Sequence, residues 1–198
     1  MNRSIVLASQ NTGKLSEMKA LLIDYPCTLL SASEAGYTQP IVENGLTFTD
    51  NARIKAEAIC QALDCWAVAD DSGLEVDYLG GQPGVFSARY SRENASDREN
   101  NEKLLAELRG VQPENRRARF VSIIALSRPN EDTVFFEGIC EGTILLEPDG
   151  AGGFGYDPLF LPDGESLSFA AMAPEDKNAI SHRGKAMRLL RGFLLELQ

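Results

Sequence analysis

The chain has 198 residues, is 43% hydrophobic and carries a formal net charge of −10. Its length and apolar content suffice for a buried core, and we expect one domain over residues 1–198. The acidic balance argues against a nucleic-acid partner, because that attraction depends on Lys and Arg side chains that neutralise phosphates.

The amino-terminal residues do not resemble a secretory signal. They reach the polar stretch 9–14 too soon, and no apolar run is long enough to cross a bilayer. We therefore expect a soluble, cytoplasmic protein with no membrane partner. The four cysteines show no CxxC spacing, so neither structural zinc nor a disulfide framework is expected.

The first third of the chain predicts two strands and two helices. Residues 4–8 form an apolar run rich in β-formers, and apolar residues recur at helical spacing after the polar stretch 9–14. A second strand is expected over 28–31, followed by a loop over 32–45. Thr47 has an aspartate three residues later, a pattern like a capping box that predicts a helix beginning near Thr47.

An acidic pair follows an apolar run in the middle of the chain. Residues 66–69 are apolar and precede the sequence Asp70-Asp71-Ser72-Gly73. We expect a buried strand that ends here and delivers acidic side chains to a site at its carboxyl end. The alternative is a plain turn, since Asp, Ser and Gly are common turn residues. In a strand, only one of the two carboxylates would face a given ligand, because successive side chains point to opposite faces.

The second half of the chain predicts an amphipathic helix over 97–108 and an antiparallel hairpin of two long strands over 117–127 and 133–146. The segment 147–162 is rich in Gly and Pro and is expected to be a shaped loop. A final helix over 183–197 carries an apolar face made of Ala186, Leu189, Leu190, Phe193, Leu194 and Leu197. Mixed helices and strands without strict βαβ alternation indicate an α/β fold with a mixed sheet.

The polar turn after the first strand is a candidate phosphate site. It precedes a helix whose amino end would offer backbone N–H groups and a positive dipole. Lys14 would add a full charge, and Ser9 and Asn11 would add hydrogen bonds. The turn lacks the second glycine and the following Ser or Thr of a Walker A motif. Taken alone, it is also compatible with a turn that binds nothing.

The acidic positions suggest metal chemistry. Magnesium prefers carboxylate oxygens together with substrate phosphates, so Glu43 from a neighbouring loop would complete a site begun by the acidic pair. No Ser/His/Asp or Cys/His set stands out for nucleophilic catalysis. Hydrolysis by a metal-activated water is the simpler chemistry.

A cluster of donors near the carboxyl end suits an oxygen-rich ligand. His182 is the only histidine, and a lone histidine beside an arginine is more often a surface or capping residue than a catalyst. Together with Arg183 and Lys177, however, it concentrates hydrogen-bond donors in an acidic protein. Phe154 and Tyr156 would either stack on a planar base or pack in the interior.

Short motifs spread along the chain resemble those of the inosine triphosphate pyrophosphatase family. Each motif is weak alone, but their order and ordinary spacing are very unlikely to arise by chance. They extend from the first predicted strand to the last helix. The motifs are Ser9-x-Asn11-x-x-Lys14, Glu43-Asn44-Gly45-Leu46-Thr47-Phe48, Asn51-Ala52-x-x-Lys55-Ala56, Asp70-Asp71-Ser72-Gly73-Leu74, Gly153-Phe154-Gly155-Tyr156-Asp157-Pro158 and Ile180-Ser181-His182-Arg183-Gly184.

The resemblance implies an α/β fold of two lobes around a long, twisted mixed β-sheet with flanking helices, a nucleotide cleft between the lobes, and a homodimer. It also implies Mg²⁺-dependent hydrolysis of non-canonical purine nucleoside triphosphates (ITP, dITP and XTP) to the monophosphate and pyrophosphate. This activity would cleanse the nucleotide pool and keep these nucleotides out of DNA and RNA.

The resemblance also assigns roles to residues. Glu43 and Asp71 would hold Mg²⁺, Asp71 would act as the catalytic base, and Asp70 would support the acidic site. Separately from the resemblance, we hypothesise that Arg183 or a loop backbone N–H donates to the 6-oxo group of the base. The expected substrate-binding residues are Ser9, Gln10, Asn11, Thr12, Gly13, Lys14, Lys55, Ser72, Phe154, Gly155, Tyr156, Asp157, Lys177, His182 and Arg183.

Two rival functions use the same observations. A related pyrophosphatase for modified pyrimidine or canonical nucleotides would share the metal chemistry, but the intact Ser181-His182-Arg183 segment argues against it. The second rival is a nucleotide-binding sensor that has lost catalysis. Such a sensor would not need all three acidic residues, so the presence of Glu43 together with Asp70 and Asp71 argues against that role.

Overall fold

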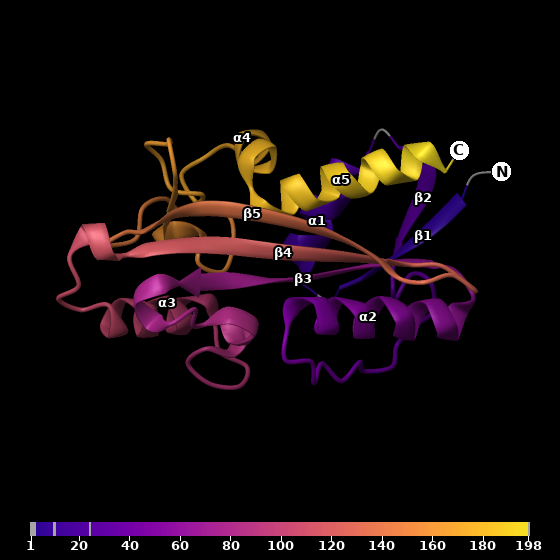
Figure 1. Ribbon diagram of the computed structural model, residues 1–198, viewed down its shortest axis with the longest axis horizontal. Coiled ribbons are helices and arrows are strands. Elements are labelled where there is room, and N and C mark those ends of the chain that lie inside the picture. Colours follow the sequence, from indigo (N-terminus) through magenta and orange to yellow (C-terminus); the bar gives the residue numbers. More distant parts are fainter. Residues whose placement is uncertain (1–2, 10, 24, 198) are drawn as a thin grey trace. The chain divides into compact units, whose positions relative to one another are not determined.

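The computed structural model describes residues 3–9, 11–23 and 25–197 of a mixed α/β protein (Figure 1). The chain divides into two compact units. Unit 1 comprises Met1–Asp71, Ser122–Gly138 and Arg183–Gln198, and unit 2 comprises Ser72–Val121 and Ile139–His182. The elements are β1 (Arg3–Ala8), α1 (Thr12–Leu21), β2 (Cys27–Ser31), α2 (Phe48–Leu63), β3 (Trp66–Val76), α3 (Asp97–Glu107), β4 (Arg117–Ser127), β5 (Val134–Ile144), β6 (Phe160–Pro162), α4 (Pro174–Ile180) and α5 (His182–Glu196).

The strands form a six-stranded mixed sheet in the order β2-β1-β3-β4-β5-β6. In unit 1, β1 pairs in parallel with both β2 and β3. The register sets Ala8 at the end of β1 opposite Ala69 in β3. The polar turn after β1 is therefore level with the acidic pair that follows Ala69.

Side-chain caps fix where the first two helices begin. The side chain of Asn11 accepts from the backbone N–H of Lys14 at 3.0 Å and caps α1. Thr47 caps α2 by accepting from the N–H of Asp50 at 3.1 Å, which confirms the predicted start of that helix. Such caps satisfy backbone donors that the first helical turn leaves without partners.

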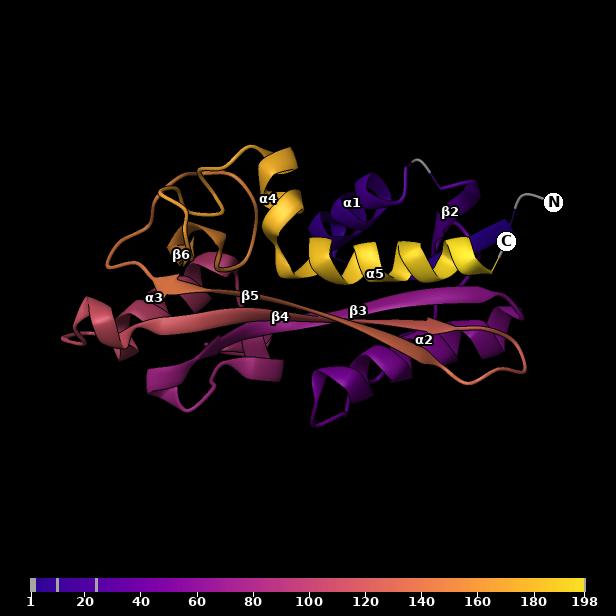
Figure 2. The same ribbon diagram turned by 45° about the horizontal axis from the view of Figure 1, so that its top comes forward.

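In unit 1, α1 and α5 lie on one face of the strands and α2 lies on the opposite face (Figure 2). Ile5, Leu7 and Val68 on the strands pack with Met18 of α1 and Leu190 of α5 in one buried cluster. Burial of these apolar side chains holds the helices against the sheet.

The apolar face of α5 differs from the expected one. Ala186, Leu190 and Leu194 are fully buried, whereas Leu189, predicted on the same face, is 55% exposed. Successive residues of a helix are rotated by about 100°, so the buried side chains of α5 form an arc centred toward Met187. Leu189 lies outside that arc.

Unit 2 contains a second core and the antiparallel pair β5 and β6. The core includes the rings of Phe120, Phe160 and Phe169, whose centroids lie 4.7 to 6.0 Å apart. A Cβ on Gly142 of β5 would lie 2.4 Å from the carbonyl oxygen of Leu161, so close strand pairing requires glycine there.

Strand β3 is longer than the predicted strand. We predicted a strand that ends at the acidic pair, or a turn there, but β3 continues through Val76 and contains Asp70 and Asp71 in its interior. Leu74 and Val76 are fully buried, and this burial together with strand pairing overrides the turn preference of Ser72 and Gly73.

The bounds of the other elements differ less from the predicted ones. The strand predicted over 133–146 is the shorter β5, and α4 and β6 were not predicted. All four cysteines are free thiols. Within the described residues, no helix combines the length and the apolar character needed to cross a bilayer.

Candidate active site

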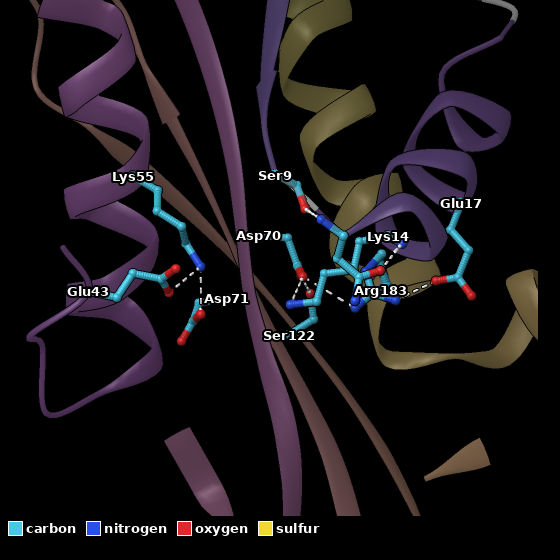
Figure 3. Close-up of polar contacts among 10 residues, drawn as sticks. Ser9, Lys14, Glu17, Glu43, Lys55, Asp70, Asp71, Ser122 and Arg183 are labelled. Carbon is cyan, nitrogen blue, oxygen red and sulfur yellow. Dashed lines mark hydrogen bonds and ion pairs between the residues drawn. The ribbon is translucent and has the colours of Figure 1, made fainter. Parts of the chain in front are cut away.

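Strand β3 directs Asp70 and Asp71 to opposite sides, and each carboxylate meets its own cations (Figure 3). Both residues are buried, with relative exposures of 1% and 8%. The alternation of strand side chains therefore makes two separate polar clusters from one acidic pair, and both clusters lie in unit 1.

The Asp70 cluster is a buried ion network. The Asp70 carboxylate lies 2.7 Å from Lys14 Nζ and 3.2 Å from an Arg183 guanidinium nitrogen, and Ser122 donates its hydroxyl to it at 2.6 Å. Burial alone would raise the pKa of Asp70, but Arg183 and Lys14 outweigh burial and hold that pKa well below its usual range. Asp70 is therefore a permanent anion at neutral pH.

Arg183 and Lys14 depend on this anion. Arg183 is 2% exposed and also pairs with Glu17 of α1. Burial would lower the pKa of Arg183, but Asp70 and Glu17 raise it above its ordinary value. Burial lowers the pKa of Lys14 despite the attraction of Asp70. The guanidinium that we considered as a donor to the base is thus engaged by two carboxylates in this structure.

The Asp71 cluster contains Lys55 and Glu43. Lys55 Nζ of α2 lies 2.6 Å from Asp71 Oδ1 and 2.9 Å from Glu43 Oε2 (Figure 3). The loop that carries Glu43 is tied to α2 by a 2.9 Å hydrogen bond from the Gly45 N–H to the side chain of Asn51. A Cβ at position 45 would lie 2.6 Å from that side-chain oxygen, so glycine is required for this approach.

The protonation tendencies of the Asp71 cluster favour a basic carboxylate beside a cation. Burial raises the pKa of Asp71 above its ordinary value, although Lys55 opposes the effect. Burial would lower the pKa of Lys55, but Asp71 and Glu43 outweigh burial and raise it. Asp71 is consequently a better proton acceptor than an exposed aspartate.

The donor set of this cluster fits magnesium. Oxygens of Glu43 and Asp71 already converge on one positive centre, the Lys55 ammonium. Among the described residues, no group of three or more His, Cys, Asp or Glu side chains is placed to hold a metal. Mg²⁺ commonly uses one or two carboxylates and takes its remaining ligands from water and substrate phosphates, which suits a two-carboxylate site.

The polar turn after β1 is ordered by its own side chains. Ser9 Oγ accepts from the N–H of Asn11 at 3.2 Å, and Thr12 and Gly13 are the first residues of α1. The positive end of the α1 dipole therefore lies at this turn, close to the Lys14 ammonium. Gln10, another expected phosphate ligand, lies outside the described residues.

The remaining predicted residues lie mostly in unit 2, where Asp157 organises a glycine-rich loop. Asp157 Oδ2 accepts from Lys177 Nζ at 2.6 Å and from the Phe154 N–H at 2.8 Å. Lys177 Nζ also lies 4.8 Å from the centroid of the Phe154 ring. Gly153 has φ +70°, and a Cβ there would lie 2.0 Å from Asp157 Oδ2, so only glycine fits.

Two unit 2 aromatics lie in the interior. Tyr156 is 4% exposed and donates its hydroxyl to the carbonyl of Ser87 at 2.9 Å. Of the two roles considered for Tyr156, stacking on a base and packing in the interior, the structure shows the second. His182 stacks on Phe120 with ring centroids 4.6 Å apart.

Gly155 and Ser72 are the other two predicted site residues in unit 2. The Gly155 N–H donates to Asp97 at 2.6 Å, which ties the glycine-rich loop to the start of α3. Ser72 is half-buried in β3.

Comparison with known proteins identifies the family. The profile of the Ham1 family matches residues 5–193. The chain belongs to the Ham1 family. It is 44% identical over 192 residues to the dITP/XTP pyrophosphatase of Bacillus subtilis (strain 168), covering 97% of each chain. It is 48% identical over 190 residues to the dITP/XTP pyrophosphatase of Geobacter sulfurreducens, covering 96% of each chain.

Solved structures of Ham1 proteins share this fold. The Ham1 protein of Staphylococcus aureus is 41% identical and superposes with a TM-score of 0.89, over 99% of this chain and 100% of the other. A dITP/XTP pyrophosphatase of Mycobacterium abscessus is 42% identical, with a TM-score of 0.77 over 94% of this chain and 98% of the other.

Several partners in this Ham1 chain were not predicted. Glu17, which pairs with Arg183, lies three residues after Lys14 on α1, and that helical spacing is the only local signal for it. Ser122 lies in β4, and Phe120 in the same strand carries the stacked His182. The pairing of β4 with β3 brings Ser122 to Asp70, and no spacing in the sequence indicates this contact.

Proposed function

We propose that this Ham1 chain hydrolyses non-canonical purine nucleoside triphosphates, namely ITP, dITP and XTP, to the monophosphate and pyrophosphate in a Mg²⁺-dependent reaction. The substrate class is supported by the relatives that the chain matches over nearly their whole length, which are dITP/XTP pyrophosphatases. The observation that carries the proposal is the convergence of Glu43 and Asp71 on one cation, the Lys55 ammonium.

Different residues of the chain would bind the metal, accept the proton and stabilise the leaving group. Glu43 and Asp71 would hold Mg²⁺, which when bound screens phosphate charge and acidifies water. Asp71 would also accept a proton from the attacking water. Lys14, Lys55 and the amino end of α1 stabilise the negative charge that develops on the pyrophosphate leaving group.

Base selection requires donors for the 6-oxo group. An adenine amino group at that position would leave such donors badly paired, and discrimination of this kind can be large. Lys177 and His182 are candidate donors, and Arg183 is a further candidate only if it exchanges one of its carboxylate partners for the base. The resemblance further supports a cytoplasmic homodimer that keeps these nucleotides out of DNA and RNA.

A substrate panel tests this proposal. Parent protein is incubated with ITP, dITP, XTP, ATP, GTP and pyrimidine triphosphates, with Mg²⁺ and with a chelator, and pyrophosphate release is measured. We expect Mg²⁺-dependent release from ITP, dITP and XTP far above the others. Preference for a pyrimidine or for ATP, or equal rates with chelator, would overturn the proposal. Asp132→Asn removes one acidic charge at an exposed position and serves as a control for a change of charge alone.

A further inference from the structure

Lys55 occupies the space that the proposed metal site would use. Its ammonium lies between Asp71 Oδ1, at 2.6 Å, and Glu43 Oε2, at 2.9 Å, and its side chain is 10% exposed (Figure 3). Among the described residues, no other Lys or Arg forms an ion pair with either carboxylate. The single cation of this cluster thus contacts both proposed magnesium ligands.

We propose that Lys55 is a resident counter-ion that holds the Glu43 and Asp71 carboxylates together without metal and leaves them when Mg²⁺ and the triphosphate bind. This inference rests on the proposed function. It makes Lys55 a positioning residue in the free protein and a phosphate ligand in the complex. Metal binding and nucleotide binding are therefore coupled through one side chain.

The charges of the cluster explain why such a counter-ion is needed. Two partly buried carboxylates carry two negative charges within reach of one nitrogen, and without a cation they would repel each other and draw in water. Lys55 removes half of that charge and fixes the distance between the two oxygens. The site stays assembled with a net charge of about −1, which still attracts a cation.

Competition for the same oxygens explains why Lys55 must leave. Both carboxylates already accept a hydrogen bond from the Lys55 ammonium, so a divalent cation on these oxygens would meet a like charge at close range. Lysine is a compact point charge on a flexible four-carbon stem, which allows the ammonium to move to a new anion. A bound triphosphate supplies that anion. Without nucleotide, only water is available to replace the two carboxylates as partners of the ammonium.

This arrangement predicts weak metal binding to the free protein and strong binding with nucleotide. A coupling free energy between two ligands is reciprocal, so nucleotide should tighten metal binding by the same factor as metal tightens nucleotide binding. Removing the Lys55 charge should abolish much of that coupling, because the carboxylates are then open to metal before nucleotide arrives.

The test measures Mn²⁺ binding directly, by calorimetry or by electron paramagnetic resonance, in the absence of nucleotide. We expect Lys55→Gln to bind Mn²⁺ about tenfold more tightly than the parent. Lys55→Arg keeps a cation and should bind as weakly as the parent. Lys19→Gln removes the same charge from an exposed lysine of unit 1 and should leave Mn²⁺ affinity unchanged.

A second measurement guards against a poorly folded variant. The melting temperature of each protein is recorded with and without Mn²⁺, because a ligand that binds only the folded state stabilises it. Mn²⁺ should raise the melting temperature of Lys55→Gln more than that of the parent. Adding Glu43→Gln to Lys55→Gln should remove this gain, which would assign the Mn²⁺ effect to the same carboxylates.

The outcomes separate the two proposals. If the parent binds Mn²⁺ without nucleotide as tightly as Lys55→Gln, the counter-ion inference is wrong and the proposed function stands on the substrate panel. If neither protein binds Mn²⁺ even with a non-hydrolysable ITP analogue, the metal site fails, and the proposed function fails with it.

Discussion

Replacing Asp70 with asparagine tests the buried ion network most severely. The carboxylate is completely buried and faces Lys14 at 2.7 Å and Arg183 at 3.2 Å. Asparagine has nearly the same shape but no charge, so the substitution leaves both cations buried without their shared anion. Removing one partner of a buried ion pair typically costs about 3–5 kcal/mol.

Two features of the structure place the expected loss at the lower end of that range. Asparagine keeps an acceptor for the hydroxyl of Ser122, and Arg183 keeps its pair with Glu17. We therefore expect Asp70→Asn to lower the free energy of unfolding by about 3 kcal/mol at neutral pH. For a chain of this size, that loss lowers the melting temperature by about 6–12 °C.

The pH dependence of this difference follows from the lowered pKa of Asp70 in the folded protein. In the unfolded chain an aspartate titrates near about 3.9, so the Asp70 carboxylate contributes its full stabilisation above that pH. The contribution is lost as the pH falls below the unfolded value toward the folded pKa. The stability difference between parent and variant should be constant from about pH 8 to about 5 and shrink below about 4.

Urea unfolding of the parent, Asp70→Asn and Asp132→Asn over this pH range provides the measurement. The exposed control should match the parent at every pH. Our reasoning would be refuted by an Asp70→Asn protein as stable as the parent at pH 7. A stability loss that stays the same at pH 3 would show that charge is not its cause.

Three further substitutions test other parts of the account. Asp71→Asn should lower kcat for ITP by about 10²–10⁴-fold while the melting temperature shows a folded protein, because the proton acceptor is lost. Tyr156→Phe should reduce the free energy of urea unfolding by about 1 kcal/mol, because the buried carbonyl of Ser87 loses its donor. Gly153→Ala should cost more than about 1 kcal/mol in the same assay, because φ is +70° and the new Cβ would meet Asp157. Near-parental turnover of Asp71→Asn would remove Asp71 from the chemistry. Unchanged stability of Tyr156→Phe or Gly153→Ala would contradict the described contacts of that residue.

Local sequence chemistry was enough to predict many elements. The Thr47 cap, the strand over Arg117–Ser127 and the final helix follow from side-chain capping and hydrophobic spacing, which act over a few residues. The separation of Asp70 from Asp71 also follows from the alternation of strand side chains. These are properties of neighbouring residues and need no knowledge of the tertiary structure.

The clusters themselves depend on pairing between distant segments. Ser72 and Gly73 favour a turn locally, yet they lie in a strand because β3 is paired and buried beyond them. Lys14 meets Asp70 because Ala8 is in register with Ala69, and Ser122 arrives from β4. The sequence alone does not determine that register, so it indicates candidate residues but not which of them are in contact.

The products formed from ITP show which phosphoanhydride bond the protein cleaves. Phosphorus NMR of ITP incubated with Mg²⁺ and the parent protein follows every phosphorus species in one sample. Cleavage between the α and β phosphates predicts inosine monophosphate and pyrophosphate in equal amounts, without orthophosphate, and turnover by Asp71→Asn about 10²–10⁴-fold slower than by the parent. Inosine diphosphate with orthophosphate, or the same products from Asp71→Asn at the parental rate, would contradict the account.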